Sequence, residues 1–138
     1  MSSAQTASDD PAYIDASAFL RLVLKERESA ALAAFLQRER RHLAASAVLE
    51  VEAGRAAGLV GSDALSLAAA HLGSVELIEV TPAIRMLARA VGPTSLRTLD
   101  AIHLATAIEI GAREMLVYDQ RLADAATAYG LSALSPGA

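Results

Sequence analysis

Cysteine and tryptophan are absent from this chain of 138 residues, and only 4% of its residues are aromatic. Without cysteine, the protein can form neither disulfides nor the thiolate sites that hold structural zinc and iron–sulfur clusters. With so few aromatic rings, it offers little on which nucleic-acid bases could stack. Any recognition of nucleic acid should therefore depend on backbone, metal and shape.

Long apolar runs are also missing. Stretches without charged residues, such as 64–75, are too short to span a bilayer. The first ten residues, MSSAQTASDD, contain no apolar segment of the kind found in signal peptides. We therefore expect a soluble, cytoplasmic protein that makes no membrane contact.

An excess of positive charge is lacking too. The formal net charge of −4 argues against a non-specific nucleic-acid binder with a broad basic face, although arginines cluster within residues 38–41. No GxSxG, Walker, GxGxxG or HExxH motif occurs, which excludes triad hydrolases, P-loop enzymes, dinucleotide binders and zincins. A phosphoacceptor receiver domain would need a lysine after its last strand, and the C-terminal LSALSPGA has none.

Strand-like apolar runs alternate with helical patterns, which predicts an α/β fold: a three-layer α/β/α sandwich around a mostly parallel sheet of about five strands. We expect residues 1–11 to form a disordered tail and 12–136 a single domain. Ser46 and Thr81 are expected to cap helices, and Gly73 to be a C′ residue. The expected strands cover residues 12–15, 42–45, 75–80, 115–118 and 131–134, and the helices end near 24, 40, 58, 72, 91, 110 and 129.

Four acidic residues occupy similar places in this pattern. Asp15 and Asp119 each close a short apolar run, and Glu52 and Asp100 each lie in the opening turns of an expected helix. In a parallel sheet, these places meet at the carboxyl edge, where α/β proteins keep their sites. Two charges about 4 Å apart repel by roughly 4 kcal/mol at an effective dielectric of 20. Four such carboxylates indicate a site for Mg²⁺ or Mn²⁺, which prefer oxygen ligands.

Each acid also has an ordinary structural explanation. Asp15 suits a turn, Asp119 is a good helix N-cap, and the macrodipole favours Asp100 in a first turn. Glu50 and Glu52 differ by about 200° around their helix, so only one can face the site, and spacing does not choose between them. The hypothesis therefore depends on the coincidence of all four acids at one sheet edge.

Three neighbours could assist the acids. Ser17, two residues after Asp15, could donate its hydroxyl to a carboxylate or simply cap a helix. His103 and Arg97 each lie one helical turn from Asp100, although a satisfied buried histidine and a solvated arginine are the favoured interpretation. The remaining histidines, His42 and His71, are expected to be structural or exposed.

Four segments together resemble the PIN-domain ribonucleases, and most closely the VapC-type toxins of type II (VapBC) toxin–antitoxin systems. These segments follow the family's order and spacing over about residues 12–136. They are YIDASAF (13–19), SAVLEVEAGRA (46–56), LRTLDAIHLATA (96–107) and LVYDQRLADAA (116–126).

The resemblance assigns catalytic or metal-ligating roles to the motif positions. The first acid is Asp15, with Ser17 as the hydroxyl residue that follows it. The family's glutamate lies shortly before Arg-Ala, which selects Glu52 over Glu50. The third and fourth acids are Asp100 and Asp119. One departure is visible, because the Thr or Ser that commonly lies two residues before the fourth acid is replaced by valine here.

The resemblance also implies a function. It implies a five-stranded parallel sheet, dependence on Mg²⁺ or Mn²⁺, and endonuclease activity on RNA. It further implies a VapB-type antitoxin whose C-terminal segment blocks the acidic site, a homodimer, and contact with promoter DNA only through the antitoxin. Two alternatives stay open: a non-catalytic binding domain of the same fold, and a DNA-directed nuclease, because carboxylates alone do not detect a 2′-hydroxyl.

Overall fold

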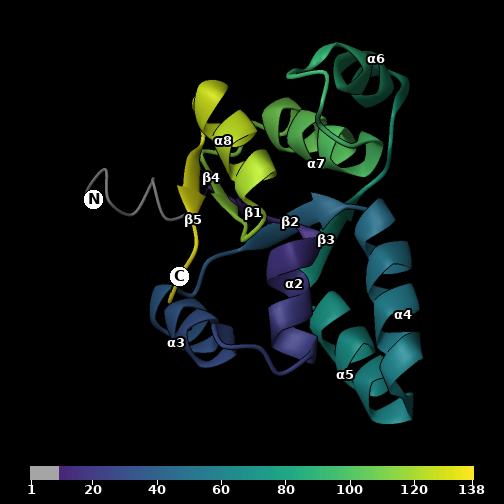
Figure 1. The fold of residues 1–138 in the computed structure, drawn as a ribbon, viewed down its shortest axis with the longest axis vertical. Helices are drawn as coiled ribbons and strands as arrows, with labels where there is room; N and C mark the ends of the chain where they lie inside the picture. Colours follow the sequence, from purple (N-terminus) through teal and green to yellow (C-terminus); the bar gives the residue numbers. More distant parts are fainter. Residues whose placement is uncertain (1–9) are drawn as a thin grey trace.

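Five parallel strands form one sheet at the centre of the computed structural model, which describes residues 10–138 (Figure 1). The strand order is β3-β2-β1-β4-β5, and every neighbouring pair is parallel. Residues 1–9 of the predicted tail lie outside the described residues. The strands are β1 (Ala12–Ile14), β2 (Leu43–Ser46), β3 (Val75–Ile78), β4 (Glu114–Leu116) and β5 (Ser132–Leu134).

Helices cover both faces of this sheet. Figure 1 shows α6, α7 and α8 on one side and α2, α4 and α5 on the other, so the predicted α/β sandwich is confirmed. None of the helices within residues 10–138 is long and apolar enough to cross a membrane. Their bounds are α2 (Ala16–Val23), α3 (Ser29–Glu39), α4 (Val48–Val60), α5 (Ser62–Leu72), α6 (Pro82–Ala90), α7 (Thr98–Glu109) and α8 (Gln120–Ala128).

The central strand β1 carries the middle of the core. Its three residues are buried, as expected for a strand with parallel neighbours on both edges and helices on both faces. Leu49 of α4 and Leu104 of α7 belong to the helical layers on opposite sides of the sheet, and both side chains are fully buried. Helix α7 is buried at every residue from 101 to 107 except Ile102, which is partly exposed.

Several predicted boundaries were wrong by a few residues. Ser46 is the last residue of β2 rather than an N-cap, although its hydroxyl still accepts the amide N–H of Val48 at 3.2 Å. Helix α4 runs past the expected end at Gly58 to Val60. Gly73 has a right-handed φ of −63°, so it is not the left-handed C′ residue that glycine there suggested.

Other local predictions are confirmed. Thr81 caps α6, accepting the amide N–H of Ile84 at 3.2 Å, and Pro82 follows at the first helical position. Asp119 caps α8 after β4, as expected, and Asp15, which was expected in a turn, caps α2 after β1. These two strands are neighbours, so the two capping carboxylates lie at the same edge of the sheet.

Packing of α7 against the sheet should dominate the stability of this fold. Leu104→Ala leaves a cavity where the side chain was fully buried, and should lower the free energy of unfolding by about 2–5 kcal/mol. Leu59→Ala, at a side chain that is 91% exposed on α4, should change it by no more than about 0.5 kcal/mol. Urea denaturation of both variants measures the difference, and equal losses would contradict the described packing.

Candidate active site at the carboxyl edge of the sheet

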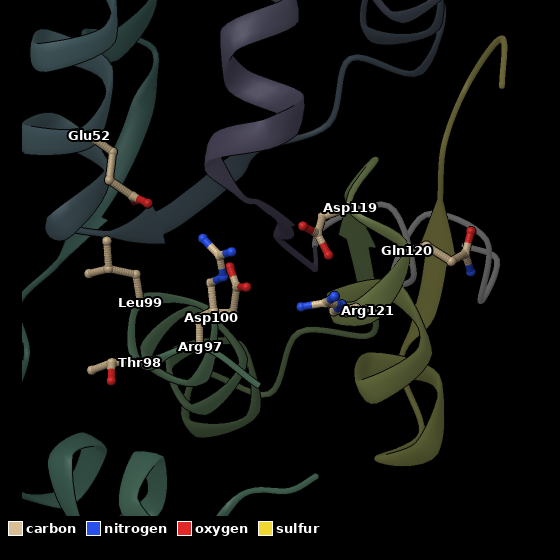
Figure 2. Close-up of a pocket in the computed structure, with 8 residues that line it drawn as sticks. All are labelled: Glu52, Arg97, Thr98, Leu99, Asp100, Asp119, Gln120 and Arg121. Carbon is tan, nitrogen blue, oxygen red and sulfur yellow. The ribbon is translucent and has the colours of Figure 1, made fainter. Parts of the chain in front are cut away.

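Three of the four predicted acids line one cavity of about 720 Å³. Glu52 reaches it from α4, Asp100 from the first turn of α7, and Asp119 from the cap of α8 (Figure 2). The three helices begin after different strands or loops, and the parallel sheet brings their N-terminal ends to one side. The other lining residues are Arg97, Thr98, Leu99, Gln120 and Arg121.

The fourth acid, Asp15, does not line this cavity and is only 2% exposed. Its carboxylate accepts the amide N–H of Ala18 at 2.9 Å and the Ser17 hydroxyl at 2.7 and 2.9 Å. Burial raises the pKa of Asp15 to about 6, even though these hydrogen bonds and the nearby His103 oppose the shift. Asp15 is thus a fixed carboxylate that carries its charge at a desolvation cost.

Ser17 joins Asp15 to the loop that carries Asp119. While its hydroxyl donates to Asp15, its oxygen accepts the amide N–H groups of Tyr118 at 2.9 Å and Asp119 at 3.2 Å. Val117 occupies the position where the family commonly has a hydroxyl, and it is fully buried. The hydroxyl that orders this loop therefore comes from Ser17, across the pair formed by β1 and β4.

Glu52 is held by a chain of hydrogen bonds that begins in the core. Its Oε1 lies 2.7 Å from Nε2 of His103, and Nδ1 of His103 lies 2.6 Å from the Tyr13 hydroxyl. That hydroxyl accepts the amide N–H of Ser46 at 2.8 Å. If the phenol gives its single hydrogen to Nδ1, the proton on the neutral ring is on Nε2 and is donated to Glu52.

This hydrogen-bond network also shows which of the two candidate glutamates lies at the site. Glu50 is exposed, whereas Glu52 lies in the cavity against His103. His103 is the satisfied buried histidine that was favoured from sequence, and it also touches the acidic cluster. In the sequence, the three-residue spacing between Asp100 and His103 indicated that the two side chains can share one face of the helix. His42 is exposed beside Glu76, and the His71 ring packs edge-on against Phe19.

Electrostatics link the carboxylates around the cavity. Burial raises the pKa of the Asp100 carboxyl, and the charges of Asp119 and Glu52 raise it further. The electrostatic interactions of the Asp100 carboxyl with His103 and Arg97 oppose this rise in its pKa. Asp100 is only half-buried, and the mutual repulsion shows that the three acids interact across the cavity.

The side chains of the acidic cavity have the ligand chemistry that a hard divalent cation prefers. The acids supply carboxylate oxygens only, which suit Mg²⁺ and Mn²⁺, and no cysteine is available to favour a softer metal. Among residues 10–138, however, no group of three or more such side chains stands ready to hold an ion as arranged. Repelling carboxylates would need to draw together around a cation, because the cation removes the repulsion that keeps them apart.

The sequence matches a known domain family and named relatives. The PIN domain family matches residues 12–128. The chain is 37% identical to ribonuclease VapC46 of Mycobacterium tuberculosis over 126 residues, which is 90% of this chain and 96% of the relative. It is 38% identical to ribonuclease VapC35 of the same species over 130 residues, covering 91% and 96% of the two chains.

Solved structures share the fold. VapBC2 from Rickettsia felis, bound to a DNA fragment from its promoter, gives a TM-score of 0.71 at 11% identity, covering 88% of this chain and 96% of that one. Mycobacterium tuberculosis VapC20, a toxin that cleaves the sarcin–ricin loop, gives 0.69 at 18% identity, covering 90% and 98%. With the family match and the VapC46 and VapC35 identities, we conclude that the chain belongs to the PIN-domain family and is a homologue of the VapC ribonucleases.

Proposed function

We propose that this protein is a metal-dependent endoribonuclease that acts as the toxin of a toxin–antitoxin pair. The observation that carries the proposal is the cavity shared by Glu52, Asp100 and Asp119, at the sheet edge where Asp15 is fixed. Relationship to proteins named as VapC ribonucleases supports RNA as the substrate. It also supports arrest of growth as the consequence of cleavage.

Each carboxylate has a different part in this proposal. Asp15, Glu52 and Asp100 would hold Mg²⁺ or Mn²⁺, and Asp119 would hold a second ion or orient the attacking water. A bound divalent cation supplies charge neutralisation and a water of lowered pKa. Asp119 can serve because only its Oδ1 is used in capping α8, at 3.0 Å from the Leu122 amide nitrogen. Ser17 is a positioning residue, since its hydroxyl is fully engaged.

The polar contacts around the acids preorganise them. Asp15 is fixed by two donors before any substrate arrives, and Glu52 is fixed through His103 to the core residue Tyr13. Fixed ligands reduce the reorganisation needed when the phosphodiester binds. Among the three acids that line the cavity, Asp119 is exposed, and Glu52 and Asp100 are partly buried.

Partners and location are part of the same proposal. A VapB-type antitoxin would block the acidic cavity, and DNA would be contacted only through that antitoxin. The R. felis VapBC2 structure holds a DNA fragment from the promoter, which supports a DNA-binding toxin–antitoxin complex here. We also propose a homodimer in the cytoplasm and one catalytic domain over residues 12–136. Size-exclusion chromatography with light scattering would test the dimer.

Expression in a bacterial host tests toxicity directly. Wild-type protein should arrest growth and produce discrete new RNA ends, whereas Asp100→Asn should do neither, because it removes a cation ligand without changing the shape of the side chain. Sequencing of RNA ends would identify the target. Equal growth and intact RNA with both proteins, each folded and soluble, would favour the non-catalytic binding domain.

Paired glutamate variants test the metal site. With Mn²⁺ at about 100 times its dissociation constant, wild-type protein should gain about 2.7 kcal/mol of stability. Glu50→Gln should gain the same, because Glu50 is exposed, while Glu52→Gln should lose most of the gain and its cleavage activity. Thermal denaturation with and without Mn²⁺ gives the comparison. Stabilisation that survives in Glu52→Gln and is lost in Glu50→Gln would reverse the assignment.

Matched nucleic acids separate the nuclease alternatives. RNA and DNA strands of the same sequence, taken from the mapped cleavage site, should differ, with the RNA cut and the DNA left intact in Mg²⁺ or Mn²⁺. The expected preference follows from relationship to ribonucleases, since carboxylates alone do not read the 2′-hydroxyl. Comparable cleavage of both strands would favour the DNA-directed alternative.

A further inference from the structure

Two arginines share the acidic cavity and have no described partner there. Arg97 precedes α7 and Arg121 lies in the first turn of α8, and both line the cavity with the three carboxylates. Figure 2 shows both side chains on the carboxylate side of this space. Within residues 10–138, neither guanidinium lies within 4.0 Å of an acidic oxygen, whereas Arg21, Arg41 and Arg113 each pair with an acid.

Their positions on the helices are unfavourable for folding. Arg97 is the N-cap residue of α7 and makes no side-chain capping hydrogen bond, and Arg121 is the second residue of α8. A helix N-terminus carries partial positive charge, so a cation there destabilises the helix. Arg97 attracts the Asp100 carboxylate at longer range, but neither helix stability nor a close ion pair accounts for the two arginines.

Phosphate groups would account for both. The guanidinium fork matches two phosphate oxygens, and it keeps its charge at every physiological pH. The chain has a net charge of −4 and few aromatic rings, so it has neither a general basic surface nor stacking surfaces with which to hold a nucleic acid. Local positive charges beside the carboxylates would attract a polyanion into an acidic cavity.

We propose that Arg97 and Arg121 bind backbone phosphates of the RNA strand on either side of the cleaved bond. This inference rests on the proposed ribonuclease function and adds the groups that hold the substrate. The carboxylates, with their cation, take the scissile phosphate, and the two arginines take neighbouring phosphates. Because the arginines contact backbone only, they contribute affinity without reading sequence.

Binding measurements without cleavage test the proposal. The background is Glu52→Gln, which stops cleavage and leaves Asp100 in place near Arg97. Fluorescein-labelled poly(U) is titrated at several salt concentrations, and anisotropy gives the dissociation constant. Adding Arg97→Gln or Arg121→Gln should each weaken binding about tenfold, the scale of a charged hydrogen bond. Each should also reduce the slope of log K against log salt by about 0.7.

Arg40→Gln is the matched control. Arg40 is exposed between α3 and β2, at the opposite edge of the sheet, and has no ion pair among the described residues. Arg40→Gln removes the same net charge at a residue that does not line the cavity, and it should therefore leave poly(U) affinity and the salt slope unchanged. An equal effect of Arg40→Gln would overturn the proposal, since it would show dependence on total charge alone.

Cleavage kinetics and stability separate the remaining outcomes. With an otherwise wild-type chain, either cavity variant should raise KM about tenfold with a much smaller change in kcat, and the melting temperature should stay equal or rise. A fall in melting temperature with unchanged KM would show a structural role. That result would overturn the phosphate-binding role of the arginines and leave the proposed ribonuclease function standing. Absence of RNA cleavage by wild-type protein would overturn the proposed function, and the RNA substrate with it.

Discussion

Repulsion among carboxylates at the carboxyl edge of the sheet is the constraint to which the rest of this structure responds. Burial raises the pKa of Asp15, and burial together with the charges of Asp119 and Glu52 raises the pKa of Asp100. Each acid except Asp100 is consequently tied to a donor that holds its position: Asp15 to the Ala18 amide, Glu52 to His103, and Asp119 to the Leu122 amide. These donors offset part of the electrostatic cost and fix the ligands in advance.

The hydrophobic core and the site are joined through the central strand. Tyr13 lies in β1 with its ring fully buried, and its hydroxyl contacts both the β2 backbone and His103. His103 in turn meets Glu52, so a core residue sets the position of a carboxylate in the cavity. A buried polar network of this kind is costly when one member is removed, because the others lose their partners. Packing around β1 and geometry at the site are therefore one mechanical unit.

Sequence reasoning reached what depends on local patterns. Asp15 and Asp119 close short apolar runs, and that position predicted the sheet edge for both and an N-cap for Asp119, which the structure has. The link from Tyr13 to His103 spans 90 residues, and that from Ser17 to the Tyr118 amide spans 101. Such contacts exist only because β1 lies between β2 and β4, and strand order is not written in any local pattern. The prediction of a left-handed C′ residue at Gly73 was wrong because glycine tolerates a left-handed conformation without requiring it.

Several unfavourable choices meet in this one place. A carboxylate is buried at Asp15, acids repel across the cavity around Asp100, and arginines stand at the positive ends of α7 and α8. Elsewhere the chain follows ordinary rules, with Thr81 and Pro82 opening α6 and Arg113 paired with Asp10. Sequences break local rules where function requires it and compensate in the remainder of the fold. In the proposed complex, a cation between the acids and a polyanion beside the arginines would offset these unfavourable terms.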